Sequence, residues 1–341
     1  MKIIFCGYHN PHFMTVTEYA EHAIRALGCD LVTFNDADFL IPGRIRSAFK
    51  PLADFDLKRL NNKLVGLNKL HRPDICVVCD GYRILPECVR EIKRMGITVV
   101  LWTMDLPRDS QSLVRSAAEY DYIFCAGTEA IEILSKHNIV NLNWLPFACD
   151  TGFHRAVDVS REEARIFGSA ISFVGSFYPN RMEILQSIAD FDLGVWGPGW
   201  EKVPKNSPLG KCVRKAGNIK TEDWVKIFCS TKINLALHFQ NGSIPCYQAS
   251  PKVFEILSCK GFLLCDNQKD VSSLFEDGNH LIIFKDAAEL RQKIEYYLDR
   301  EEERRHIGAQ GYTEAASKHT YIHRLRRMFE IIKIGNLKRH G

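Results

Sequence analysis

The sequence contains no apolar run of about 18 residues, the minimum for a helix that spans a bilayer. It opens on an apolar, strand-like segment at residues 2–7 and carries no signal-peptide core or cleavage site. The net charge is only +4 over 341 residues, which gives no general attraction to nucleic acid. These absences predict a cytoplasmic protein without a transmembrane helix and without a nucleic-acid partner.

Two common nucleotide-binding motifs are also missing. No Gly-x-Gly-x-x-Gly follows the first strand, and no P-loop occurs anywhere in the chain. Both absences weigh against a dinucleotide-dependent enzyme and against a kinase.

Metal-binding patterns are equally sparse. The chain has 12 cysteines, scattered and mostly within apolar runs. Cys76-Val-Val-Cys79 has the Cys-x-x-Cys spacing, but it lies in an expected strand, and no second pair or histidine pair stands nearby. We therefore predict no metal and no cofactor. The cysteines expected in the core are Cys6, Cys76, Cys79, Cys125, Cys229 and Cys265.

What the sequence does contain is an alternation of strands and helices. In the first half, continuous apolar runs typical of buried parallel strands alternate with helical stretches, such as Val16–Ala26 and Pro86–Met95. The expected strands are Lys2–Cys6, Leu31–Phe34, Ile75–Cys79, Thr98–Trp102, Tyr122–Ala126 and Asn141–Leu145. This pattern predicts an α/β domain built on a doubly wound parallel sheet.

The alternation restarts after a polar stretch, 147–166, that we expect to be irregular. The sequence therefore predicts two Rossmann-like doubly wound domains, 1–150 and 151–318, followed by a C-terminal helix at 319–341. Expected strands are Ile171–Val174, Leu193–Trp196, Ile233–Leu237, Phe262–Cys265 and Ile282–Phe284, and expected helices are Arg181–Ala189, Thr221–Ser230, Lys252–Ser258, Ala287–Leu298, Glu301–Ser317 and Thr320–Ile332.

One segment, 250–266, carries the strongest functional signal. It predicts a loop, a helix, a glycine stop and a buried strand that ends at Asp266. Lys252 and Glu255 fall in the first turn of the helix. Helix N-termini favour anions, Lys252 adds positive charge, and Glu255 is suited to accept hydrogen bonds from sugar hydroxyls. The segment fits a nucleotide, and it equally fits an ordinary amphipathic helix with a well-formed first turn.

The second half resembles the CgeB-type, spore-maturation glycosyltransferase-like proteins. The resemblance covers about 171 to 329, with a weaker match over 73–147. It rests on Phe173-Val-Gly-Ser-Phe-Tyr-Pro-Asn-Arg181, Trp196-Gly-Pro-Gly-Trp200, Gly217-Asn-Ile-Lys-Thr-Glu-Asp-Trp224, Lys232-Ile-Asn-Leu-Ala236, Lys252-Val-Phe-Glu-Ile-Leu257 and His319-Thr-Tyr-Ile-His-Arg324, taken in this order and spacing.

The resemblance implies a GT-B glycosyltransferase that is independent of metal. In such proteins the second domain binds a nucleotide-sugar, the first binds the acceptor, the two face each other across a cleft, and the last helix returns to the first domain. Glu255 resembles the glutamate that holds the donor ribose in retaining members. These members carry a Glu-x7-Glu motif of which Glu255 matches the second glutamate; Tyr247 stands at the first, which leaves the donor sugar and the stereochemical outcome open.

The implied reaction moves a sugar from a nucleoside diphosphate to a hydroxyl of a bacterial surface glycan, a glycolipid or a protein. Two other functions stay open. One is a non-catalytic protein that binds a nucleotide or glycan, and the other is a nucleotide-sugar epimerase. The base, the sugar, the acceptor and the oligomeric state are not encoded in any pattern found.

The expected donor-binding residues lie in loops and first turns of the second half. Arg181 could bind the diphosphate through two hydrogen bonds, or it could be a solvated first-turn residue. The tryptophans around Gly197-Pro-Gly199 could line the nucleotide or pack in the core. The expected set is Gly175, Ser176, Arg181, Gly197, Gly199, Asn218, Ile219, Lys252 and Glu255.

The first half offers candidates at the ends of two strands. Gly7 opens a loop that contains His9 and His12, and either histidine could take a proton from an acceptor hydroxyl or contact a phosphate. Asp105 follows the fourth strand and could act as a base, bind sugar hydroxyls, or cap the next helix.

Basic and apolar residues interleave over 44–72. Arg44, Lys50 and Lys58 are among its cations. Such a segment can lie on an anionic membrane, which would suit a lipid-linked acceptor, or it can be a solvated helix face.

Overall fold

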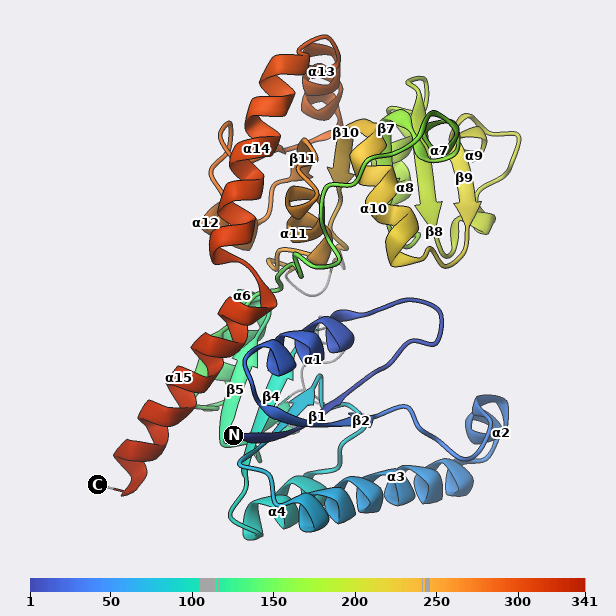
Figure 1. Ribbon diagram of the computed structural model, residues 1–341. Helices are drawn as coiled ribbons and strands as arrows, with labels where there is room; N and C mark the ends of the chain where they lie inside the picture. The colour runs from blue at the N-terminus through green and yellow to red at the C-terminus, as the bar shows by residue number, and fades with distance from the viewer. Residues whose placement is uncertain (105–113, 116, 241, 243–245, 341) are drawn as a thin grey trace. The chain divides into compact units, whose positions relative to one another are not determined.

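The computed structural model describes residues 1–104, 114–115, 117–240, 242 and 246–340, with the side chains of those up to 335. These residues form two compact units (Figure 1). Unit 1 comprises Met1–Pro146 and Arg324–Gly341, and unit 2 comprises Phe147–His323. No helix among the described residues is both long enough and apolar enough to cross a membrane.

Unit 1 is built on a six-stranded parallel sheet in the order β2-β1-β3-β4-β5-β6. Strands β3 and β5 are buried from end to end, as their continuous apolar sequences predict. The strands are β1 (Lys2–Gly7), β2 (Asp30–Asn35), β3 (Ile75–Cys79), β4 (Thr98–Thr103), β5 (Tyr122–Cys125) and β6 (Leu142–Trp144). The helices are α1 (Val16–Ala26), α2 (Gly43–Ala48), α3 (Lys50–His71), α4 (Pro86–Arg94) and α6 (Thr128–Ser135).

Unit 2 repeats this plan with the order β12-β11-β10-β7-β8-β9, again all parallel. The strands are β7 (Ser169–Val174), β8 (Leu193–Gly197), β9 (Val213–Ala216), β10 (Thr231–Ala236), β11 (Leu263–Asp266) and β12 (Ile282–Phe284). The helices are α7 (Arg161–Phe167), α8 (Pro179–Gln186), α9 (Pro208–Cys212), α10 (Thr221–Ser230), α11 (Pro251–Ser258), α12 (Lys269–Leu274), α13 (Ala287–Leu298) and α14 (Glu301–Lys318), with a 3-10 turn at Trp200–Lys202.

The last helix is α15 (Tyr321–His340), and it belongs to unit 1 from Arg324 onward. Arg324 Nε donates to the carbonyl of Pro146 at 2.9 Å, and the Tyr122 hydroxyl donates to the carbonyl of Ile332 at 3.4 Å. The backbone of the helix approaches β5 closely at Gly335, where an added Cβ would lie 2.1 Å from the Tyr122 oxygen.

The strands and helices named from the sequence are present with small shifts at their ends. Two expectations were wrong. The stretch 147–166 is not wholly irregular, because α7 begins there, capped reciprocally by Ser160 and Glu163. Cys229 is only half-buried, whereas the other cysteines expected in the core are buried.

Candidate nucleotide site in the second Rossmann-like unit

Three loops of unit 2 meet where β7, β8 and β9 end. The amide of Gly175 donates to Trp196 O at 2.9 Å, and the amide of Gly217 donates to Gly197 O at 2.8 Å. Gly197 has a φ of 140°, and a Cβ there would lie 2.1 Å from Gly175 O, so only glycine fits between its neighbours. The loops that hold the predicted residues Gly175, Ser176, Gly197, Gly199, Asn218 and Ile219 therefore form one continuous edge of the sheet.

The two tryptophans near this edge, Trp196 and Trp200, are packed in the core and do not line the surface of the site. Trp200 is 1% exposed, meets the Phe173 and Phe177 rings edge-on, and donates from Nε1 to Gly175 O at 2.8 Å. Trp196 is also buried. Of the two interpretations that the sequence left open for these side chains, the core packing is correct.

Arg181 lies in the first turn of α8 and joins the ends of β7 and β10. Its Nη1 donates to Ser176 O at 2.9 Å and its Nε to Leu237 O at 2.8 Å. Burial lowers the pKa of its guanidinium. No carboxylate among the described residues forms an ion pair with it. Its two protein hydrogen bonds are both to neutral carbonyls, so its charge is left to attract an anion at this edge.

Helix α11 presents Lys252 and Glu255 at the same edge, as the sequence predicts. The Lys252 ammonium forms an ion pair and hydrogen bond with Glu255 Oε2 and lies 3.8 Å from the centroid of the Trp224 ring. The Glu255 side chain is buried. Lys252 thus compensates the buried carboxylate and is itself held by a cation–π contact.

Glu255 stays ionised despite its burial. Burial raises the pKa of its carboxyl. The electrostatic attraction of Lys252 and His154 and the hydrogen bond from Lys252 outweigh this effect, so the pKa is lowered overall. His154 Nε2 lies 3.9 Å from Glu255 Oε1. A buried, ionised carboxylate is a strong hydrogen-bond acceptor for hydroxyl groups.

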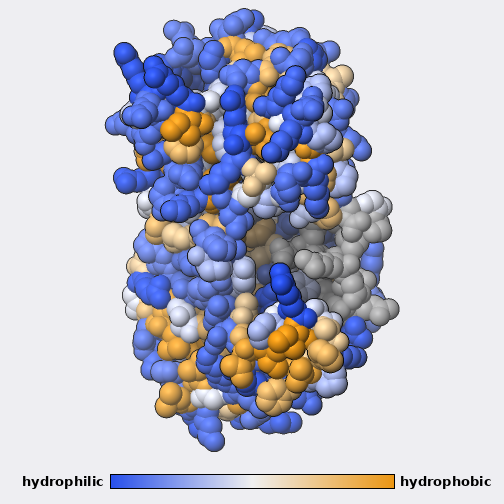
Figure 2. All heavy atoms as spheres, turned by 90° about the vertical axis from the view of Figure 1, so that its right-hand side faces the viewer, coloured by the Kyte–Doolittle hydropathy of each residue, from blue (hydrophilic) through white to orange (hydrophobic). Residues whose placement is uncertain are grey.

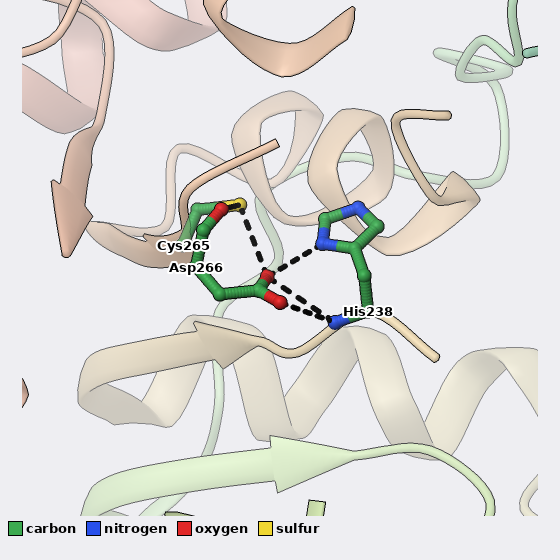
Figure 3. A group of neighbouring side chains, drawn as sticks. All are labelled: His238, Cys265 and Asp266. Atoms are coloured by element: carbon green, nitrogen blue, oxygen red, sulfur yellow. Dashed lines mark hydrogen bonds and ion pairs between the residues drawn. The ribbon is translucent and has the colours of Figure 1, made fainter. Parts of the chain in front are cut away.

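A second cluster at this edge joins His238, just beyond β10, to Asp266, the last residue of β11 (Figure 3). Asp266 Oδ1 lies 2.5 Å from His238 Nδ1, and Asp266 Oδ2 accepts from the His238 amide at 3.0 Å. The other ring nitrogen, Nε2, accepts from the amide of Ser250 at 2.9 Å. Because Ser250 is the N-cap of α11, the pair fixes the start of the helix that carries Lys252 and Glu255.

The hydrogen bonds of His238 indicate whether this cluster could bind a metal. Ligand atoms of His238, Cys265 and Asp266 lie within 4.8 Å of one another, a spacing that could suit a metal. However, a backbone amide donates to His238 Nε2, so in the neutral ring the proton sits on Nδ1 and is donated to Asp266. An Nδ1 that carries a proton has no lone pair for a metal. The cluster fits a hydrogen-bonded support better than a metal centre.

His238 also supports α8. Asn180 Nδ2 donates to His238 O at 2.9 Å, and Arg181 uses the carbonyl of the preceding residue, Leu237. The short segment 237–238 therefore holds the first turns of both α8 and α11. The sequence analysis did not select His238, although its position two residues beyond β10 and the end of the next strand at Asp266 were available signals.

In unit 1, His9 pairs with a glutamate of α1. His9 Nε2 lies 2.8 Å from Glu21 Oε1, and the Glu21 side chain is buried. The hydrogen bond to Glu21 raises the pKa of the His9 imidazole, although burial opposes it. A carboxylate that orients and charges a histidine is the arrangement used by catalytic pairs.

Replacing Glu21 by glutamine is expected to lower the pKa of His9, because the ring loses its anionic partner. A raised folded-state pKa stabilises the fold below the unfolded value, and this contribution is lost as pH rises through the folded value. NMR titration of the His9 ring tests the prediction, with Glu91→Gln on an exposed part of α4 as the control. An unchanged His9 titration in Glu21→Gln would contradict it.

The other unit 1 candidates have different surroundings. His12 is exposed, and its amide donates to Asn10 Oδ1 at 2.9 Å. Gly7 permits close packing of α1, because a Cβ there would lie 2.7 Å from Thr17 Oγ1. Asp105 lies outside the described residues. The sequence analysis missed the buried Asp36, which accepts from Arg83 Nη1 at 3.0 Å.

Comparisons with known proteins agree with this architecture. Residues 181–330 match the family described as glycosyl transferase-like. No protein of curated function matches the chain. Among solved structures, sucrose-phosphate synthase from Thermosynechococcus elongatus is similar with a TM-score of 0.70 and 12% identity, covering 99% of this chain and 98% of that one.

Two further solved structures are similar to this chain over nearly its whole length. Anabaena HepE in complex with UDP-glucose has a TM-score of 0.67 and 10% identity over 98% of this chain and 99% of its own. A glycosyltransferase from Rickettsia africae has a TM-score of 0.68 and 11% identity over 98% of both chains. At such identities the likeness establishes the fold. The chain has the GT-B fold with two Rossmann-like domains, and the family match to its second unit indicates a glycosyltransferase.

Proposed function

We propose that this glycosyltransferase transfers a sugar from a nucleoside diphosphate to an acceptor hydroxyl, with the donor held at the strand ends of unit 2. The observation that carries the proposal is the grouping of Arg181, Lys252 and the ionised Glu255 at that edge. Three similar structures of one protein, Anabaena HepE, are described as complexes with UDP and glucose, with UDP, and with UDP-glucose. That likeness supports a nucleotide-sugar as the ligand class.

Each donor residue has a distinct task in this proposal. Arg181 and the N-terminus of α11 receive the diphosphate, whose negative charge grows as the sugar leaves. Lys252 has three N–H donors, so it can keep Glu255 paired and still reach a phosphate oxygen. Glu255 accepts hydrogen bonds from the ribose hydroxyls. These cations supply the charge that stabilises the leaving group, so the proposed reaction is independent of metal and of any cofactor.

The loops beside this cluster complete the proposed donor site. Gly175, Ser176, Gly197 and Gly199 let the backbone come close to the phosphates or the sugar. Asn218 is exposed and Ile219 is buried. In this proposal the backbone of these two residues contacts the edge of the base. Base recognition by backbone atoms explains why the sequence alone names no nucleotide.

The acceptor is proposed to use unit 1. His9, oriented by Glu21 through Nε2, is a proposed proton acceptor, and the nitrogen left to take the proton is the buried Nδ1. His12 and Asp105 remain proposed contributors. The proposed acceptor is a hydroxyl of a surface glycan, a glycolipid or a protein, and membership of the CgeB-type group is proposed on the sequence motifs.

A thermal-shift panel of UDP, GDP, dTDP, ADP and CMP, measured without metal, tests the donor site. A ligand at one hundred times its Kd stabilises a protein by about 2.7 kcal/mol. We expect one nucleotide to raise Tm, and Arg181→Ala to abolish that rise. Absence of any shift at millimolar nucleotide would contradict the proposed site.

One observation favours a second function, a non-catalytic nucleotide-binding protein. Tyr247 occupies the place of the first glutamate in the Glu-x7-Glu motif of retaining members, and the Lys269 ammonium lies 4.7 Å from the centroid of its ring. Nucleotide binding without transfer or donor hydrolysis would favour this function. Release of free nucleotide with an epimerised sugar, in the absence of acceptor, would instead identify an epimerase.

A further inference from the structure

Helix α2 and the start of α3 form a corner of unit 1 at which several large apolar side chains are exposed. Short helices in water are usually stabilised by burying one face. No residue of α2 is buried. Further along α3, Leu60 and Leu64 are completely buried, so the apolar residues of 44–72 divide into a core-facing group and an exposed group.

The exposed group consists of five large apolar side chains that lie within residues 40–55. We call it the apolar corner, and it consists of Leu40, Ile45, Phe49, Leu52 and Phe55, with exposed fractions of 69%, 43%, 59%, 41% and 59%. Figure 2 faces the side of the molecule on which Figure 1 draws α2, and it shows a broad apolar patch in its lower half. Contiguous exposed apolar surface of this kind marks an interaction site.

Hydrogen bonds to Asp56 hold the backbone beside the apolar corner in place. The buried carboxylate of Asp56 accepts from the amides of Leu40 and Ile41, at 3.0 and 2.8 Å, and from Arg59 Nε at 3.0 Å. The Arg46 guanidinium lies 3.6 Å from the centroid of the Phe39 ring. The fold therefore fixes the loop before α2 against α3 while it leaves the apolar side chains outside.

Cations surround the corner. Arg44, Lys50 and Lys58 are exposed, and none of them forms an ion pair with any residue in the described part of the chain. Nearby basic residues differ, since Arg59 pairs with Asp56 and Lys63 with Asp38. The exposed carboxylate of Asp54 offsets one of these three cations, so the corner combines exposed aromatic and aliphatic side chains with a net positive charge.

We propose that the apolar corner docks unit 1 on an anionic lipid bilayer. Phe49 and Phe55 enter the boundary between headgroups and acyl chains, and Arg44, Lys50 and Lys58 contact lipid phosphates. Charge favours this occupant over a second copy of the chain, because a symmetric contact would bring the same cations together. The proposal stands apart from the donor site and would hold for a non-catalytic protein.

The test is co-sedimentation of the full chain with vesicles of phosphatidylcholine alone or mixed with phosphatidylglycerol. Binding is expected only to the anionic vesicles and should weaken as salt screens the charges. Phe49→Ser with Phe55→Ser is expected to reduce partitioning roughly 100-fold, from the lost burial of two aromatic side chains. Lys50→Gln is expected to reduce it roughly fivefold.

The matched control is Leu70→Ser, which removes an equally apolar side chain that is 75% exposed on the same helix but outside the corner. It should bind vesicles as the wild type does. The substituted side chains are exposed, so an unchanged Tm is expected for each variant. Wild-type binding by the double serine variant, or no binding of the wild type at low salt, would overturn the proposal. A lipid-independent dimer that the double variant loses would assign the corner to a second copy.

Discussion

Glu255→Gln is expected to lower kcat/KM for the nucleotide-sugar by roughly 100- to 1,000-fold, because two hydrogen bonds to a charged acceptor are weakened. The carboxylate is buried and ionised, which makes it a strong acceptor for the ribose hydroxyls. The ribose is remote from the bond that breaks, so most of the loss should appear as a raised KM for the donor. Steady-state kinetics with the nucleotide found in the thermal-shift panel measures it.

The control for this variant is Glu289→Gln. Glu289 also pairs with a lysine of its own helix, Lys293, at 2.7 Å, but it lies on α13 and contacts none of the proposed donor residues. It should leave kcat/KM unchanged. Wild-type kcat/KM in a folded Glu255→Gln protein would remove Glu255 from the donor site.

His238→Ala is expected to destabilise the fold by about 3 to 5 kcal/mol, because it leaves the Asp266 carboxylate buried without its partner. For a chain of this size the corresponding fall in Tm is roughly 10 °C. The variant also removes the acceptor for the Ser250 amide, which frees the start of α11. Donor kcat/KM should therefore fall on the order of 100-fold in the protein that remains folded. Denaturant unfolding and kinetics measure the two effects separately.

His238→Asn separates stability from positioning. The asparagine amide can still donate to Asp266 from the place of Nδ1, but it does not extend to the Ser250 amide. We expect most of the stability to return while the loss of donor kcat/KM persists. His306→Ala, at an exposed position of α14, is the control for histidine removal. Equal recovery of stability and kcat/KM in His238→Asn would show that His238 does not position α11.

The pH dependence of this destabilisation follows from Asp266. Burial raises the pKa of its carboxyl, but the attraction and hydrogen bonds of His238 outweigh it, so the folded pKa is lowered. A lowered pKa gives stability that is present above the unfolded value, about 3.9, and is lost as pH falls through the folded value. In His238→Ala the attraction and hydrogen bond of the imidazole are lost, while the amide of residue 238 and Gln268 Nε2 still donate to the carboxylate. The folded pKa of Asp266 therefore rises, and the difference in stability between the variant and the wild type should narrow as pH falls.

Local patterns were enough to predict most of the elements. Continuous apolar runs gave the strands, and a proline start with a glycine stop gave α4 (Pro86–Arg94) almost to the residue. Errors arose where the signal is weak. The short β9 (Val213–Ala216) has an exposed, charged sequence and was not expected. Its place at the sheet edge explains this, because an edge strand need not be apolar on both faces.

The residues of the proposed donor site differ in the same way in how far the sequence predicts their contacts. Lys252 and Glu255 are three residues apart on one helix, so helical geometry alone brings their side chains together. His238 and Asp266 are 28 residues apart, and their contact depends on β10 and β11 being neighbours in register. Sequence spacing does not encode that register, which is why the pair was not predicted.

The sequence by itself determined the α/β class, the tandem Rossmann-like plan, and the composition of the first turns of α8 (Pro179–Gln186) and α11 (Pro251–Ser258). Those features depend on periodicity and spacing within one element. Tertiary structure alone decided that His9 pairs with Glu21, that His238 supports α11, and that the apolar residues near α2 stay outside the core. Each of these depends on strand order and helix packing, which bring together residues that no local pattern links.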